Sequence, residues 1–373
     1  DVLYLLAELV DKSLIAFEPS LNRYRMLEPV RQYAQERLAE AGDEAGTCDR
    51  HLQFHVALAG RAQRELAGPH RDTWLARLDA ERENILLAFA HARRAPEGGS
   101  AGLGMAHALL MWMTYREVEL WYGVVLQALA HPDAQQEDLA RCRALYAAAS
   151  MCNLTGRGVE GFALAQSSVK VARACGDVPA LTESLTRLGY AAVESDRAAD
   201  ALEYFLEGLA LARQLDNRHQ VYGCLCGLGE VHSLEDRFEL AEEAYLEALA
   251  VLRGTTMDDP VVLGNLARNA IALRAESKAI RYLRKMVAIS QGKYENYFVA
   301  ILLRNCAGLA ALRREWAQAL RFGGAVTAFE ERHNFFDLVD ARFHARSMCT
   351  AREAMGADPA DAAFAAGRAL GSD

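Results

Sequence analysis

The sequence predicts an all-α protein built from repeated helical hairpins, and three observations lead to this prediction. Apolar residues of matched size recur about every forty residues along most of the chain. Alanine and leucine dominate and only 8 of the 373 residues are proline, which favours helix because Ala and Leu lose little side-chain freedom there. Two short strand-like runs, Ser13–Glu18 and Arg23–Leu27, stand apart near the beginning.

Residues 1–44 are predicted to form a helix, a hairpin and a second helix. The helical pattern of Val2–Val10 is already under way at the first residue, so we expect a piece of a longer protein. The turn "PSLN" joins the two strand-like runs, and Pro29 stands where the first turn of a helix tolerates it. One apolar face of the second helix comprises Val30, Tyr33, Ala34 and Leu38. This order resembles the last part of a winged-helix domain; the plainer alternative is an irregular helical cap with a small hairpin.

Residues 45–100 are predicted to be a helical connector. Two amphipathic stretches, Arg50–Leu66 and Asp72–Arg94, lie on either side of Gly68-Pro69, a pair that breaks helices. The stretch "APEGGSAGLG", Ala95–Gly104, has the composition of a linker. We therefore expect the repeats to occupy residues 101–356, followed by a C-terminal helix or tail at 357–373.

One unit of the repeat is Leu185–Asn217, which predicts two helices around the polar turn "ESDRAAD". The units share a small residue on the first helix and, in most, a large one on the second. The small residues are Gly189, Gly229, Ala267 and Ala307, and the large ones Phe205, Tyr245 and Leu283. Small residues let paired helices approach, large ones fill the gap to the next pair, and the units must stack to bury their apolar faces. Five units match, with a weaker one at Ala106–Ala130 and a further helix pair near the C-terminus.

The spacing Leu-x2-Leu-Gly followed by Ala-x3-aromatic resembles the tetratricopeptide repeat. The resemblance implies a right-handed superhelix whose concave face is lined by the first helix of each pair. The usual repeat has about 34 residues, so the longer spacing here predicts extended helices or turns.

Several stretches resemble bacterial STAND-class regulators, the signal-transducing ATPases that include maltose-type and antibiotic-cluster activators and related LuxR-type proteins. The matching stretches are "LLAELVDKSLI", "RYRMLEPVRQYAQERLAEAGD", "WLARLDAERENILLAFAHA" and the tail "DAAFAAGRAL". In that family a nucleotide-binding core precedes a winged helix and a helical repeat sensor. The sequence has no G-x4-G-K-[ST] phosphate loop. The resemblance therefore implies an ATPase domain upstream of Asp1, an output domain elsewhere, and no catalytic residue here.

Composition argues against several function classes. The net charge is −9 and no dense basic run is present, so we expect no direct contact with nucleic acid. The 8 cysteines form no CxxC pair, which favours reduced thiols and a cytoplasmic protein. No apolar run reaches the roughly 18 residues of a membrane span.

Catalytic and metal-binding patterns are weak. His51 and His55 have the i, i+4 spacing of helical metal ligands, but "HLQFH" lacks the glutamate of the zinc-protease motif. Two histidines on one helix face are the ordinary interpretation. We expect no enzyme activity, no metal and no cofactor.

The concave face is the better candidate for a binding site. Counting from the packing leucines places these residues there: Arg143, Tyr146, Asn153, Glu183, Tyr190, Glu230, Asn265, Arg268 and Arg304. Arg and Tyr often anchor interfaces. Arg268 and Arg304 lie on consecutive first helices, near Asn269 and Asn305. We predict a polar site for a carboxylate or a short acidic peptide; in the alternative, these side chains are solvated or paired within the chain.

The combined prediction is a sensor region of a larger regulator. Its partner would be a small-molecule inducer or a protein or peptide, and its binding would control the upstream ATPase. Two alternatives stay open at this point. One is a scaffold that recruits proteins without a small-molecule trigger, and the other is the target-recognition region of a defence-type ATPase.

Overall fold

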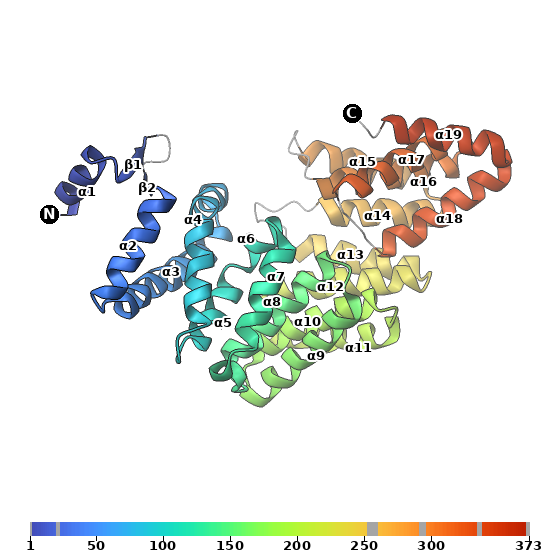
Figure 1. The fold of residues 1–373 in the computed structure, drawn as a ribbon. Helices are drawn as coiled ribbons and strands as arrows, with labels where there is room; N and C mark the ends of the chain where they lie inside the picture. Colours follow the sequence, from blue (N-terminus) through green and yellow to red (C-terminus); the bar gives the residue numbers. More distant parts are fainter. Residues whose placement is uncertain (1, 20–22, 252–259, 291–295, 334–337, 371–373) are drawn as a thin grey trace. The chain divides into compact units, whose positions relative to one another are not determined.

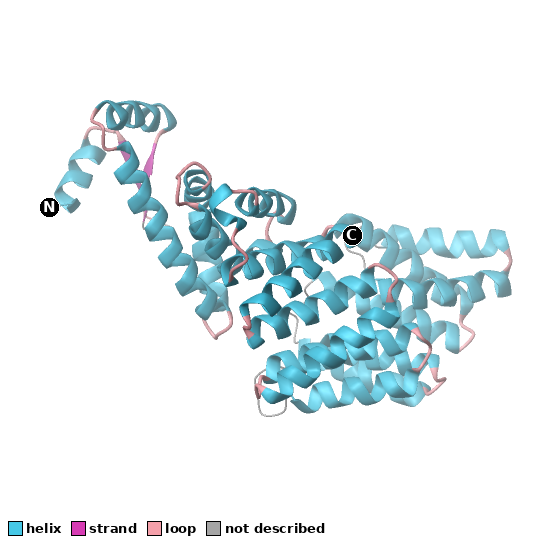
Figure 2. Ribbon diagram, turned by 90° about the horizontal axis from the view of Figure 1, so that it is seen from below, coloured by secondary structure: helices cyan, strands magenta, loops and turns pink. Residues whose placement is uncertain are grey.

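The computed structural model describes residues 2–19, 23–251, 260–290, 296–333 and 338–370 (Figure 1). The chain divides into two compact units, residues 1–109 and 110–373, which are treated separately below. Helices dominate the described part, and its one sheet is a two-stranded hairpin (Figure 2). No described helix combines the length and the hydropathy needed to cross a bilayer.

The first unit begins with the predicted helix, hairpin and second helix, here called the N-terminal segment (residues 2–40). Its elements are α1 (Val2–Asp11), β1 (Ile15–Glu18), β2 (Arg23–Met26) and α2 (Glu28–Glu40). The strands are antiparallel, with Ile15 opposite Met26 and Glu18 opposite Arg23. Pro29 lies in the first turn of α2, as predicted, whereas Ser20–Asn22 of the predicted turn lie outside the described residues.

Three helices complete the first unit: α3 (Glu44–Leu66), α4 (Arg71–Ala92) and α5 (Gly99–Ala108). The break at Gly68-Pro69 is confirmed. The expected linker Ala95–Gly104 is not one, because α5 begins within it and Leu103 is buried. A Cβ atom at Gly98 would collide with the backbone of Ala92, so glycine here permits close packing. Residues 101–109 accordingly belong to the first unit, and not to the repeats as the predicted boundary had it.

The second unit is the repeat array, a right-handed superhelix of tetratricopeptide-like hairpins. A short pair, α6 (Leu110–Tyr115) and α7 (Val118–Leu129), and the 3₁₀ turn η1 (Pro132–Gln135) lead into it. The five predicted hairpins follow as α8 (Leu139–Leu154) with α9 (Gly158–Cys175), α10 (Val178–Glu194) with α11 (Ala198–Gln214), α12 (Arg218–Leu234) with α13 (Phe238–Val251), α14 (Pro260–Ala272) with α15 (Glu276–Ser290), and α16 (Asn296–Leu312) with α17 (Trp316–His333). The further pair at the C-terminus is α18 (Leu338–Met355) and α19 (Ala357–Leu370).

The predicted pairing of small residues on the first helix with large residues on the second holds the hairpins together. A Cβ atom at Gly189 would lie 2.7 Å from the ring of Phe205, so the ring needs a glycine opposite it. Gly229 and Tyr245 repeat the arrangement one hairpin later, and both rings are completely buried. Their burial joins neighbouring hairpins into one continuous core.

Every one of the five hairpin turns uses the same backbone device. One residue after each first helix has a left-handed conformation: Gly156, Asp196, Asp236, Arg274 and Arg314. The next amide then donates to a carbonyl five residues back, as Arg237 N does to His232 O at 2.8 Å. This is the Schellman type of helix ending. It fixes Asp196 and Asp236 at equivalent places forty residues apart.

Candidate functional site

The first helices of the array carry a polar face over α8, α10 and α12. Of the predicted residues, Arg143 and Asn153 are exposed, and Tyr146, Glu183, Tyr190 and Glu230 are half-buried. Arg143 and Glu183 occupy equivalent positions in successive hairpins, and so do Tyr190 and Glu230. The two members of each pair are thus forty residues apart, which is one repeat.

Arg187 is a member of this face that the sequence analysis missed. It lies four residues after Glu183 and three before Tyr190, hence on the same side of α10. Its guanidinium pairs with Glu194 at 2.6 Å and lies 5.4 Å from the ring centre of Tyr190. We call Arg143, Tyr146, Glu183, Arg187, Tyr190 and Glu230 the polar face.

Burial changes the pKa of two residues of the polar face, Glu183 and Tyr190. It raises the pKa of Glu183, although Arg143 acts in the opposite direction. Burial also raises the pKa of Tyr190, whose hydroxyl donates to the carbonyl of Gly223 at 3.0 Å. Tyr190 thereby joins two first helices, α10 and α12.

The remaining predicted residues are buried, whereas residues that line an open groove would be exposed. Asn265, Arg268 and Arg304 are 6 %, 3 % and 2 % exposed. Arg304 Nε lies 2.7 Å from Glu330 Oε1 of α17, so this guanidinium is bound within its own hairpin. Arg268 instead donates to the hydroxyl of Tyr245 at 3.3 Å. Both arginines are buried inside the array, which corrects the prediction that they are available on an open concave face.

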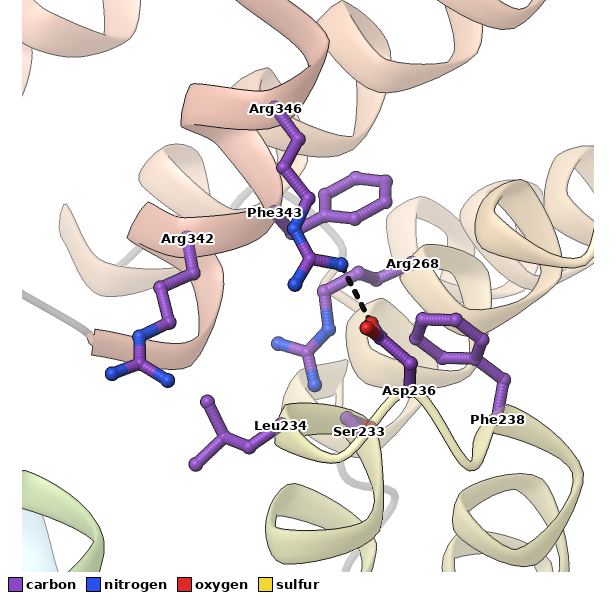
Figure 3. Close-up of a pocket in the computed structure, with 8 residues that line it drawn as sticks. All are labelled: Ser233, Leu234, Asp236, Phe238, Arg268, Arg342, Phe343 and Arg346. Atoms are coloured by element: carbon purple, nitrogen blue, oxygen red, sulfur yellow. Dashed lines mark hydrogen bonds and ion pairs between the residues drawn. The ribbon is translucent and has the colours of Figure 1, made fainter. Parts of the chain in front are cut away.

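Arg268 lines a small cavity of about 20 Å³ beneath α18 (Figure 3). We call it the α18 cavity. Its walls come from the end of α12, the start of α13, α14 and α18, and consist of Ser233, Leu234, Asp236, Phe238, Arg268, Arg342, Phe343 and Arg346. Arg346 Nη1 lies 2.6 Å from Asp236 Oδ1, the contact drawn in Figure 3.

The helix α18 is held against two successive hairpin turns. Arg342 Nη2 pairs with Asp196 Oδ1 at 2.7 Å, as Arg346 pairs with Asp236. The arginines are one helical turn apart, and the aspartates are the left-handed turn residues one repeat apart. Sequence separations of 146 and 110 residues explain why no local pattern predicted this contact.

The two histidines of α3 belong to an ionic network of the first unit. His55 Nε2 lies 3.7 Å from Glu81 Oε2, and the His51 ring lies 4.2 Å from the His55 ring. Arg23 of β2 pairs with Glu81 at 3.0 Å and donates to the carbonyl of Ala80. The nearby His55 ring, followed by the Asn84 amide and the Arg23 guanidinium, lowers the pKa of Glu81 to about 2 against the opposing effect of burial. Glu81 thus links the hairpin to α3 and α4.

The N-terminal segment exposes an unusual number of large apolar side chains. None of the residues of α1 is buried, and Val2 is 71 % exposed. The other exposed members are Leu3, Tyr4, Leu5, Phe17, Tyr24, Met26, Leu27 and Tyr33. Tyr33 was predicted on the apolar face of α2; its companions Val30, Ala34 and Leu38 are half-buried. Exposed large apolar side chains thus gather in this segment of the sequence.

A wider hollow of about 630 Å³ lies between α3 and the start of α5. Leu52, Val56 and Ala101 supply its apolar walls, while Asp49 and Glu97 lie at its polar side. Asp49 pairs with His91 at 2.7 Å. The hollow has no convergent set of polar groups of the kind that orients a small ligand.

Comparison with known proteins finds similarity to proteins named as transcriptional regulators. No family model matches the chain. Proteins of Mycobacterium bovis and Mycobacterium tuberculosis, named as putative HTH-type transcriptional regulators, are each 32 % identical over 229 residues, which is 58 % of this chain. The chain spans about a quarter of the length of these curated relatives, since the match covers 25 % of each.

Solved structures agree with the fold. A Rap protein complexed with Competence and Sporulation Factor gives a TM-score of 0.53 at 11 % identity, covering 83 % of this chain and 98 % of that one. Aspartyl phosphate phosphatase F of Bacillus subtilis gives 0.51 at 13 %, covering 86 % and 89 %. A STAND protein of Pyrococcus horikoshii with a tetratricopeptide repeat sensor gives 0.44 at 15 %, covering 99 % and 55 %, a score too low to carry an argument. The chain therefore resembles part of a transcriptional regulator and folds as a tetratricopeptide-like repeat region.

Proposed function

We propose that this chain is the sensor and coupling region of a larger transcriptional regulator of the STAND class. In this proposal the repeat array binds a peptide, a partner protein or a small inducer on the polar face, and the chain itself performs no catalysis. The observation that carries the proposal is the polar face itself. It presents two arginines and two tyrosines on α8 and α10, with Glu230 on α12, and arginine and tyrosine are residue types that anchor interfaces.

The comparisons support the regulatory part of the proposal. The relatives that share 32 % of their residues over the match carry the name of transcriptional regulators. The Rap protein, which shares the fold, was solved with Competence and Sporulation Factor bound. A regulator of this kind would act in the cytoplasm.

The N-terminal segment supports the coupling part. Its exposed apolar residues, Leu3 and Tyr4 among them, would be covered by an ATPase domain in the longer protein. Glu81 holds Arg23 of the hairpin, so movement of α4 would be transmitted to that surface. A ligand switches such a device only if it binds one arrangement more tightly than the other.

Thermal unfolding of the chain against a library of metabolites and short peptides tests the proposal. A ligand at about 100 times its dissociation constant stabilises the folded state by about 2.7 kcal/mol. We expect this stabilisation to shrink in Tyr190→Ala and Glu230→Ala. Glu243→Ala is the matched control, since Glu243 is an exposed glutamate on the second helix of the same hairpin as Glu230.

The outcomes separate the candidate functions. A ligand that stabilises the control and the two polar-face variants equally would refute a binding site on this face. If no compound or peptide acts, the partner is a protein, and cross-linking from the positions of Arg143 and Asn153 identifies what contacts the face. Cross-links that avoid the polar face would count against the proposal.

A further inference from the structure

We infer that the α18 cavity binds one carboxylate of the ligand, carried by a short acidic peptide or a small carboxylic acid. The inference rests on the proposed function, because it names the chemistry of the group that the sensor recognises. It concerns a different place from the polar face. The site combines one arginine of the array, Arg268, with two arginines of α18.

Three arginine residues line this one small space, and the guanidinium of Arg342 is turned towards Asp196. Arg268 is 3 % exposed and reaches the cavity from inside the array, while Arg342 and Arg346 reach it from α18. The planar fork of a guanidinium matches the two oxygens of a carboxylate. Asp196 pairs with Arg342 and Asp236 with Arg346, so a carboxylate that enters the cavity meets Arg346 by exchange with Asp236.

A carboxylate of the chain already makes the contact that the ligand would make. Asp236 Oδ1 lies 2.6 Å from Arg346 Nη1, and both side chains are more than half exposed. An incoming carboxylate therefore competes with an exposed side chain for Arg346. Asp236 serves as an internal model of the ligand group, because it shows that α18 offers Arg346 to a carboxylate.

The volume of the α18 cavity and the residues of its walls limit the chemical groups that the carboxylate can carry. A volume of about 20 Å³ takes a head group and not a whole molecule. Phe238, Phe343 and Leu234 stand beside the arginines. These apolar walls favour a carboxylate on an apolar or aromatic stem, with the rest of the ligand outside.

Binding at this place would act on α18. Arg342 and Arg346 attach α18 to the turns after α10 and α12. A ligand that takes Arg346 from Asp236 exchanges one of these attachments for its own. The position of α18 then depends on the ligand, which connects recognition to a structural change in the array.

Calorimetric titration of the whole chain tests the inference. The probes are succinate, the peptide acetyl-Phe-Glu-Phe-Glu-amide and inorganic phosphate. We expect saturable binding of a carboxylate probe, about tenfold weaker in Arg346→Gln because one charge-assisted, forked contact is lost. Asp236→Asn should act in the opposite direction and tighten binding, since it releases Arg346.

Two further variants keep the test decisive. Arg268→Met should weaken binding like Arg346→Gln, and if the buried substitution prevents folding, the exposed Arg346→Gln decides alone. Arg213→Gln is the matched control, since Arg213 is an exposed arginine that pairs with Glu247 at 2.6 Å away from the cavity. Its binding constants should equal those of the unmodified chain.

Several results would overturn the inference. One is that neither carboxylate probe binds saturably. Another is that Arg346→Gln and Arg213→Gln lose the same amount of binding affinity. The third is that phosphate binds more tightly than both carboxylates. If succinate binds and the peptide does not, the natural ligand is a small acid. If the peptide binds and succinate does not, the natural ligand is a peptide. A ligand lost in Tyr190→Ala but unchanged in Arg346→Gln would leave the proposed function standing and remove only the carboxylate site.

Discussion

In the repeat array Phe205 and Tyr245 are completely buried, whereas in the N-terminal segment Phe17 and Tyr24 are each 42 % exposed. The same residue types thus have opposite surroundings in the two units. In the array, each aromatic ring finds a glycine opposite it on the first helix of its own hairpin. In the N-terminal segment, Phe17 and Tyr24 contact mainly each other across the hairpin, with ring centres 5.0 Å apart. The array has a core of its own, while the N-terminal segment needs another surface to bury its rings.

Truncating matched phenylalanines should show this difference most strongly. Phe205→Ala removes a fully buried ring and leaves a cavity, so the free energy of unfolding should fall by about 3–5 kcal/mol. Phe17→Ala removes a ring that is already exposed to solvent, so the free energy of unfolding should fall by less than about 1 kcal/mol. Urea unfolding followed by circular dichroism measures both. Equal losses would contradict the comparison.

The buried ion pair of the array should give the next effect. Arg304→Met removes the guanidinium that lies 2.7 Å from Glu330, and we expect a loss of about 3 kcal/mol in the free energy of unfolding. Replacing both residues, as Arg304→Met with Glu330→Leu, should recover most of that loss because both charges of this pair are then removed. If the double variant were as unstable as the single one, packing and not charge would explain Arg304.

These two residues also show how far sequence reasoning reaches. Phe205 was predicted because its size and spacing repeat, and repetition is a local property of the sequence. Arg304 was placed on the correct helix but not at the correct depth, since its burial depends on Glu330 of α17. Arg342 and Arg346 were missed altogether, because their partners lie more than a hundred residues away and follow no period. The repeat period of the sequence predicts the fold. It does not predict the α18 cavity, because that cavity depends on contacts between residues that are not related by the period.

Two glutamates should respond to acid in opposite directions in the two units. Folding lowers the pKa of Glu81 to about 2, so the unfolded chain takes up this proton first as the pH falls. Its stabilisation is complete above about pH 5 and is lost towards pH 2, and we expect about 1–2 kcal/mol. Glu81→Gln should remove this part of the pH dependence, measured as the free energy of unfolding between pH 5 and pH 3.

Glu183 on α10 serves as the opposite case. Burial raises its pKa, so the folded chain takes up this proton first and gains stability as the pH falls through the raised pKa. Glu183→Gln should therefore slightly stabilise the array at pH 7. A loss of stability in Glu183→Gln at pH 7 would show that the pairing with Arg143 outweighs burial.

The smallest effect in the isolated chain is expected for the exposed residues of α1. Leu3→Ser and Leu5→Ser change side chains that are 68 % and 57 % exposed, so the free energy of unfolding should stay within about 0.5 kcal/mol. Leu58→Ser on α3 is the control, since Leu58 is 1 % exposed in the same unit and should destabilise it strongly. In the longer protein, where we propose that an ATPase domain covers α1, the same Leu3→Ser should weaken the coupling between sensor and ATPase. An effect of Leu3→Ser in the isolated chain as large as that of Leu58→Ser would mean that α1 is already packed there, and the need for a covering partner would disappear.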